Sequence, residues 1–162
     1  MRKRITTMAI VGALAVATAA TAATRPSATK TETFTAIDTS NTSQTATVIA
    51  TGAFTDGGTF PINKATKNTI RLGRGTIQVR SHATQPPKTV INQSACLVTE
   101  HAAGTYTLSH GTGAYKGISG SGRFKQSASQ VGPRVNGRCS FTSGSPIASQ
   151  QSVIAKGKVS LP

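Results

Sequence analysis

Acidic side chains, which many enzymes use as general acids and bases, are rare in this sequence of 162 residues. Against 18 lysines and arginines the chain carries only four of them: Glu32, Asp38, Asp56 and Glu100. Glu100 is the candidate catalytic acid, because the other three fall in segments predicted to be leader or turn. It shares strand parity with Cys96 and Val98, so Glu100 points inward if those two residues do.

A carboxyl group inside an apolar core must be paired or neutral. The partners that the sequence offers for an inward Glu100 are Arg80, His82 and Tyr115. The simpler alternative is a glutamate at the end of a strand that reaches solvent or a nearby base. The sequence leaves both interpretations open.

The two cysteines, Cys96 and Cys139, predict one disulfide bond in an exported protein. No Cys-x-x-Cys motif is present, and the three histidines lack the His-x-x-x-His and His-Glu-x-x-His spacings of zinc sites. The bond would close a loop of 43 positions, for which chain entropy suggests about 4 kcal/mol. We therefore expect a structural disulfide, with no metal and no cofactor.

A glycine-rich stretch at residues 104–124 fits neither a phosphate-binding loop nor a hydrolase elbow. Lys116 precedes Gly117, whereas a phosphate loop places its lysine after a glycine. Ser119 is followed by Gly120 and Ser121, whereas the elbow Gly-x-Ser-x-Gly needs its glycine one position later. Basic residues beside Tyr115 and Phe124 could suit single-stranded nucleic acid. With seven aromatics in all and no tryptophan, nucleic acid is not the expected partner.

The first 23 residues have the features of a secretory signal peptide. A basic start, Arg2-Lys3-Arg4, precedes an apolar run at residues 9–17 and small residues at 20–23. That run is shorter than the roughly 20 residues of a membrane span. We expect a signal peptide at 1–23, a flexible leader at 24–30, one domain at 31–162, an extracellular location and no membrane span after cleavage. Subtracting the three basic residues lowers the formal charge from +14 to +11, which favours association with anionic polymers.

Short runs of alternating apolar and polar residues predict an all-β chain. The expected strands are residues 31–38, 46–54, 69–72, 76–83, 94–102, 105–109, 123–131 and 150–160, and Asp56-Gly57-Gly58 is expected to be a turn. Five structural glycines predict a corner in a strongly curved sheet, with Gly117 or Gly120 at its bend: Gly111, Gly113, Gly117, Gly120 and Gly122. A closed antiparallel β-barrel of about eight strands is favoured, and a β-sandwich is the alternative.

The run Gly-Thr-Gly-Ala-Tyr-Lys-Gly-Ile-Ser-Gly-Ser-Gly at residues 111–122 resembles the glycine-rich signature of the allene oxide cyclase and dirigent barrel superfamily. It is most similar to small secreted bacterial members, most of which lack an assigned activity. The resemblance extends from about residue 45 to the C-terminus. It implies a barrel whose interior holds a small ligand, as plant members hold oxidised fatty acids or phenoxy radicals. The catalytic polar clusters of the family match no position here.

Two functions from different classes follow. One is a secreted barrel that binds a small, mostly apolar ligand, with Ala83, Arg80 and Tyr115 as the candidate ligand-binding residues. Ala83 is included because it shares strand parity with Ile77 and Val79. The other is a non-catalytic cationic protein that binds anionic cell-surface polymers. Whether any reaction is catalysed stays open.

Overall fold

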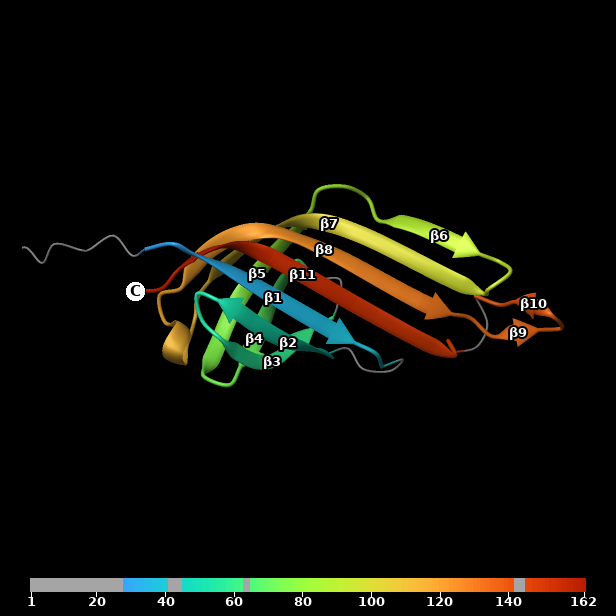
Figure 1. The fold of residues 1–162 in the computed structure, drawn as a ribbon, viewed down its shortest axis with the longest axis horizontal. Helices are drawn as coiled ribbons and strands as arrows, with labels where there is room; N and C mark the ends of the chain where they lie inside the picture. The colour runs from blue at the N-terminus through green and yellow to red at the C-terminus, as the bar shows by residue number, and fades with distance from the viewer. Residues whose placement is uncertain (1–27, 41–44, 63–64, 142–144) are drawn as a thin grey trace, which may run out of the picture.

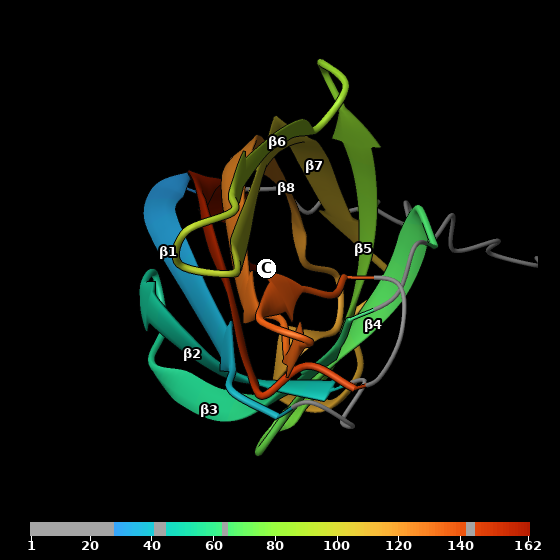
Figure 2. The ribbon, with the colours of Figure 1, turned by 90° about the vertical axis from the view of Figure 1, so that its right-hand side faces the viewer.

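The computed structural model describes residues 28–40, 45–62, 65–141 and 145–162, and the predicted signal peptide lies outside them. The described chain is all-β and forms a closed antiparallel barrel of eight strands, in the order β5-β4-β3-β2-β1-β11-β8-β7, closed by pairing of β5 with β7 (Figures 1 and 2). The barrel strands are β1 (Lys30–Asp38), β2 (Thr45–Gly52), β3 (Asp56–Pro61), β4 (Lys67–Leu72), β5 (Gly75–Ala83), β7 (Leu97–Ser109), β8 (Ser119–Val131) and β11 (Ala148–Ser160). The barrel prediction is confirmed, and the sandwich alternative is wrong.

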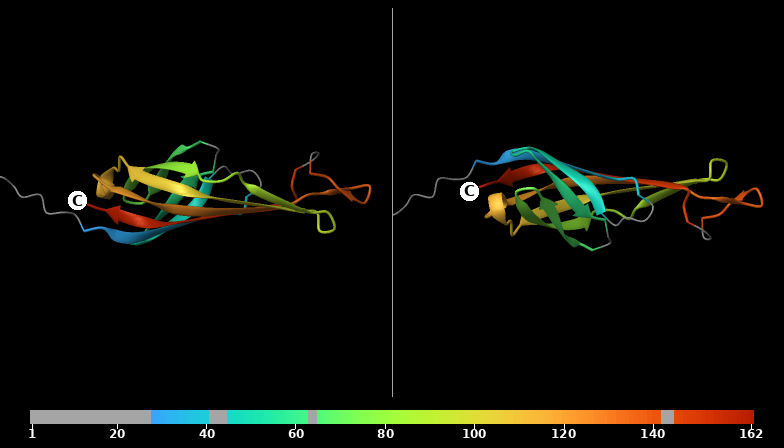
Figure 3. Two further views of the ribbon diagram at one scale, coloured as in Figure 1. Left: turned by 90° about the horizontal axis from the view of Figure 1, so that it is seen from above. Right: turned by 90° about the horizontal axis from the view of Figure 1, so that it is seen from below.

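Three strands are longer than the barrel is deep. The outer halves of β7, β8 and β11 continue past it, and β6 (Lys88–Asn92) pairs with the first part of β7. We call this four-stranded part the strand extension; it comprises β6 and residues 97–101, 127–131 and 148–150. In Figure 3 it runs out from the barrel as a single layer of strands. The barrel therefore has an end that faces the extension and an opposite end.

The barrel interior is filled by every second side chain of the strands, because successive residues of a strand point to opposite faces of the sheet. In β1 the residues Glu32, Phe34 and Ala36 are buried, and the residues between them are half-buried. In β2 the buried residues are Ala46, Val48 and Ala50, separated by exposed ones. The same parity in β7 places Tyr106 and Leu108 in the core.

The end of the barrel away from the extension is closed by the connection between β7 and β8. This connection contains the 3-10 turn η1 (Gly113–Tyr115), and the Tyr115 side chain is only 1% exposed. The Tyr115 ring packs on that of Phe54 with centroids 4.8 Å apart. A Cβ on Gly111 would lie 1.8 Å from the Tyr115 carbonyl oxygen, so the turn can fold this tightly only around glycine.

Several local predictions need correction. Asp56-Gly57-Gly58 is not a turn, because it begins β3 and pairs with residues 48–50 of β2. Gly120 and Gly122 lie within β8 rather than in the corner. The two strands expected at 94–102 and 105–109 are one continuous strand, β7, because pairing with β8 runs unbroken from Leu97 to Leu108. Strand β6 was not predicted at all.

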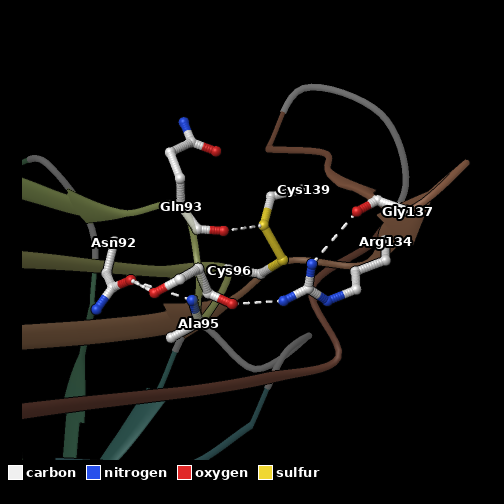
Figure 4. The surroundings of a disulfide bond; sticks show 8 residues. Asn92, Gln93, Ala95, Cys96, Arg134, Gly137 and Cys139 are labelled. Atoms are coloured by element: carbon white, nitrogen blue, oxygen red, sulfur yellow. Dashed lines mark hydrogen bonds between the residues drawn. A yellow bond between two sulfur atoms is a disulfide. The ribbon is translucent and has the colours of Figure 1, made fainter.

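The disulfide prediction is confirmed, since Cys96 and Cys139 are bonded with their Cα atoms 5.2 Å apart (Figure 4). Cys96 immediately precedes β7, and Cys139 ends the small hairpin of β9 (Arg134–Val135) and β10 (Arg138–Cys139). The Arg134 guanidinium supports the same junction by donating to the carbonyl oxygens of Ser94 and Gly137. The bond thus ties the hairpin to the tip of the strand extension. Among the described residues, no helix is long and apolar enough to cross a membrane.

Candidate functional site: the cavity in the barrel

The interior of the barrel contains a cavity of about 140 Å³. Its walls are mainly apolar side chains from β1, β2, β3, β4, β5, β7, β8 and β11. Aromatic surface comes from Phe34, Phe60, Tyr106 and Phe124, and aliphatic surface from residues that include Ala36, Val48, Ile70, Val79, Leu108 and Val153. Four neutral polar side chains also line it: Asn68, Ser81, Gln126 and Gln151. No charged side chain is among the described residues that line the cavity.

The polar side chains sit toward the extension end of the cavity. Gln126 and Gln151 lie two residues beyond Phe124 and Val153 on β8 and β11, in the direction of the extension. The opposite end is filled by Phe54, Tyr115 and other buried core residues. The cavity is therefore an apolar chamber with neutral hydrogen-bonding groups on one side.

Tyr106, one of the residues that line the cavity, carries a buried hydroxyl group. The residue is only 3% exposed, and within the described part of the chain its buried hydroxyl has no hydrogen-bond partner. Burial raises the pKa of this hydroxyl to about 12, and the charge of Glu32 acts in the same direction. The hydroxyl therefore keeps its proton at neutral pH. A buried donor without an acceptor costs about 1–3 kcal/mol.

Glu32 is the buried acid of this protein, with a side chain that is fully covered. One carboxylate oxygen accepts a hydrogen bond from the Phe54 amide at 3.0 Å, and the other accepts one from the Thr33 amide at 3.2 Å. Burial raises the pKa of Glu32 above its ordinary 4.5, while hydrogen bonds from the backbone oppose this shift. The contacts show that Glu32 holds the β2–β3 turn against β1.

Register places Tyr106 and Glu32 in one row across the barrel wall. Tyr106 pairs with Gly122, Gly122 with Gly157, and Gly157 with Glu32. A Cβ on Gly122 would lie 2.6 Å from the Gly157 Cα, so the two strands approach too closely there for a side chain. The two glycines leave the interior surface between Tyr106 and Glu32 bare, and this gives the large tyrosine side chain its space.

A second polar cluster lies at the closed end of the barrel. The Tyr115 hydroxyl donates a short hydrogen bond to Asp56, which also accepts from the Gly57 amide at 2.7 Å and the Arg74 amide at 3.1 Å. The Arg74 guanidinium forms an ion pair with Asp56 at 3.4 Å. The Tyr115 bond and these donors lower the pKa of Asp56 to about 2, and burial with the Asp56 contact raises the pKa of Tyr115 to about 12. The cluster fastens the closing turn to the start of β3.

The structure places the predicted site residues apart from one another. Tyr115 is buried in the closed end, Arg80 is exposed with parity opposite to Val79, and Ala83 is exposed near the end of β5. None of the three is among the residues that line the cavity. Ala83 does share strand parity with Ile77 and Val79, but the wall of the cavity ends at Ser81.

Glu100 is half-buried in the strand extension, opposite Thr89 on β6 and Ala128 on β8. It has the parity of Tyr106 and Leu108, so it lies on the face that continues the barrel interior, as its shared parity with Val98 allowed. It does not line the cavity, and no ion pair joins it to Arg80 or His82 among the described residues. The premise that the other acids lie in leader or turn segments is wrong, because Glu32 and Asp38 lie in β1 and Asp56 is the first residue of β3.

Tyr106 and Glu32 were not proposed as site residues from the sequence. The signal for Tyr106 was present, since it alternates with Leu108 in a predicted strand. Glu32 alternates with Phe34 and Ala36, a pattern that also fits an acid exposed at a strand end. Comparisons with models of known protein families, with curated proteins and with solved structures find no match for this chain.

Proposed function

We propose that this protein is an exported binding protein whose barrel holds one small, neutral, mostly apolar molecule. The observation that carries the proposal is an apolar cavity lined in part by Tyr106, whose buried hydroxyl has no hydrogen-bond partner in the described structure. An oxygen or nitrogen acceptor on a bound molecule would satisfy that donor and remove the cost of leaving it unpaired. Tyr106 is thus the proposed recognition residue.

The size of the cavity limits the ligand. An apolar protein cavity of about 150 Å³ binds benzene, and the cavity here is about 140 Å³. We therefore expect a ring or short chain of roughly six to ten non-hydrogen atoms. A charged ligand is disfavoured, because it would lose its hydration in a chamber lined by no charged side chain. The amides of Gln126 and Gln151 offer further neutral contacts toward the extension end.

The resemblance of residues 111–122 to the allene oxide cyclase and dirigent superfamily supports the proposal, because those barrels also use their interior. We propose membership of that superfamily on the same ground. The amino-terminal pattern supports export, and the disulfide is compatible with an extracellular protein. Catalysis is not part of the proposal.

Three probes of similar size test the ligand chemistry by titration calorimetry or by amide chemical shifts. Acetophenone offers a carbonyl acceptor, ethylbenzene offers none, and benzoate carries a charge. We expect acetophenone to bind most tightly and benzoate not at all. Tyr106→Phe should weaken acetophenone about tenfold, which corresponds to about 1.4 kcal/mol, and leave ethylbenzene unchanged.

A matched pair of alanine variants tests the location. Ala36 lines the cavity, so Ala36→Leu should fill it and abolish binding of every probe. Ala83→Leu is the control, because Ala83 is exposed and outside the cavity wall. Equal loss in both variants, or no binding of any neutral probe to the wild type, would contradict the proposed site.

A further inference from the structure

Positive charge collects on the outer wall of the barrel over β8 and β11. Arg123 and Lys125 of β8 and Lys156 and Lys158 of β11 are all exposed and have the outward parity of their strands. We call these four residues the cationic face. Arg123 pairs directly with Lys156 across the two strands. Lys125 lies two residues from Arg123 on β8, and Lys158 lies two residues from Lys156 on β11. Neighbouring Cα atoms on the face are therefore about 5–8 Å apart.

No acid neutralises this face. Glu32 faces the interior, and Asp38 has the same parity in β1. Asp56 is held at the closed end by Tyr115 and Arg74, and Glu100 lies on the face of β7 that continues the interior. These four are all the acids of the chain. Cations placed side by side on a sheet repel one another, so the charge interactions among these four residues do not stabilise the fold unless an anion binds them.

Hydroxyl groups alternate with the cations across the neighbouring strands. Lys158 pairs with Thr31 and Ser121, and Arg123 pairs with Thr105. The Lys158 ammonium donates to the Thr31 hydroxyl at 3.0 Å, and Thr105 and Ser121 are exposed. The surface thus presents charge for anionic groups and short hydroxyls for hydrogen bonds to a hydroxylated polymer.

Aromatic side chains are missing from this surface. Every aromatic residue of the described chain is buried or half-buried. Proteins that bind single-stranded nucleic acid stack bases on exposed aromatic rings, and interfacial membrane proteins insert large apolar side chains. Ile154 is exposed beside Lys125, and Ile37 and Ile49 are exposed on the neighbouring strands β1 and β2, but no exposed aromatic ring accompanies them in the described residues. A surface that combines positive charges with hydroxyl groups and exposes no aromatic ring favours a polysaccharide as its ligand.

We propose that the cationic face binds a linear polysaccharide that carries carboxylate or sulfate groups. Anionic groups of the chain contact Arg123, Lys125, Lys156 and Lys158, and sugar hydroxyls contact the threonine and serine hydroxyls between them. This function is separate from the cavity, because these side chains point away from the barrel interior. One protein therefore carries an internal small-molecule site and an external site that retains it on an anionic matrix.

A charge-matched comparison tests the location of the site. The face variant Arg123→Gln, Lys156→Gln, Lys158→Gln and the control variant Lys88→Gln, Lys116→Gln, Arg138→Gln each remove three exposed positive charges. Polygalacturonate and heparin are the probes, with neutral dextran as blank. We expect the face variant to bind both probes at least tenfold more weakly than wild type and the control variant to lose less than threefold. Equal losses would overturn the proposal, because they would show that only total charge matters.

Two further arms test the polymer class. Thr105→Val with Thr107→Val keeps the charge and removes two exposed hydroxyls next to the face; we expect about threefold weaker binding of polygalacturonate, a change that charge alone would not give. At physiological salt, duplex DNA and phosphatidylglycerol vesicles should bind more weakly than polygalacturonate. Binding of either as tightly as the polysaccharide, or an unchanged threonine variant, would overturn the assignment to a polysaccharide. Binding of acetophenone in the cavity should be unaffected in all these variants.

Discussion

A position can require glycine because its φ is positive or because a neighbouring atom leaves no room for a Cβ. Replacing four glycines by alanine tests these two reasons separately, because the four positions combine them differently. Gly57 has an ordinary φ, and a Cβ there would meet only one atom, at 3.9 Å. Gly117 has φ +80° with only the terminal Pro162 ring near it. Gly120 has an ordinary φ, but its Cβ would lie 2.5 Å from the Lys158 carbonyl oxygen. Gly113 combines φ +59° with a contact of 2.3 Å to the Arg74 carbonyl oxygen.

The expected costs follow from these distances and angles. Gly57→Ala should leave the free energy of unfolding within about 0.5 kcal/mol of wild type. Gly117→Ala should cost about 1–2 kcal/mol, the penalty of a left-handed conformation for an L-residue. Gly120→Ala should cost about 1–3 kcal/mol, because β8 and β11 must separate to admit the methyl group. Gly113→Ala carries both penalties and should be the most damaging of the four.

Urea unfolding followed by circular dichroism measures all four variants, with the disulfide kept oxidised in each. A stability change of 1 kcal/mol corresponds to about 2–8 °C in midpoint temperature for domains in this size range, so the series is resolvable by thermal melts as well. The reasoning would be refuted by Gly120→Ala being as mild as Gly57→Ala, since close approach of β8 to β11 would then not require glycine. A Gly113→Ala variant as stable as wild type would refute the account of the closing turn.

Two further predictions concern the covalent and polar fastenings of the fold. Non-reducing peptide mapping should recover the Cys96–Cys139 pair, and Cys96→Ser with Cys139→Ser should lower the free energy of unfolding by at most about 4 kcal/mol; two free thiols in the wild type would contradict the structure. Tyr115→Phe should move the pKa of Asp56 from about 2 toward its ordinary 3.8, because the Tyr115 hydroxyl is the largest cause of the depression. An acid whose pKa is lower in the folded state than in the unfolded state stabilises the fold at pH values above its unfolded-state pKa. This stabilisation is lost as the pH falls through the folded-state pKa. Wild type should therefore lose stability between about pH 4 and pH 2, more steeply than Tyr115→Phe; superimposable acid-unfolding curves would contradict the assignment.

Features that depend on neighbouring residues were predictable from the sequence. Alternation in residues 31–38, 46–54 and 76–83 gave strands close to those observed, because the side chains of a strand alternate whatever it pairs with. The oxidised Cys96–Cys139 pair was predictable because only two cysteines exist. The glycine run predicted a tight corner, and glycines 111, 113 and 117 do lie in the β7–β8 connection.

Features that depend on distant pairing were decided only by the tertiary structure. Asp56-Gly57-Gly58 has turn-forming residues, yet it is a strand because β2 supplies its hydrogen bonds. The sequence of β6 shows only a short and weak alternation of apolar and polar residues, and it forms a strand because the first part of β7 pairs with it. Alternation placed Ala83 on the same face of β5 as Ser81, but it could not show that the cavity wall ends at Ser81, and it could not show that Tyr106 lines the cavity while Arg80 does not.

The acidic residues show most clearly which properties the sequence determines and which the tertiary structure determines. Composition alone established that four acids face eighteen basic residues and that a cationic protein must result. Which side of the sheet carries each charge depends on barrel closure, which turned Glu32 into the core and left Arg123, Lys125, Lys156 and Lys158 on the outer wall. Burial of a carboxylate is costly unless backbone amides bind it, and the amides that bind Glu32 include that of Phe54, 22 residues away along the chain.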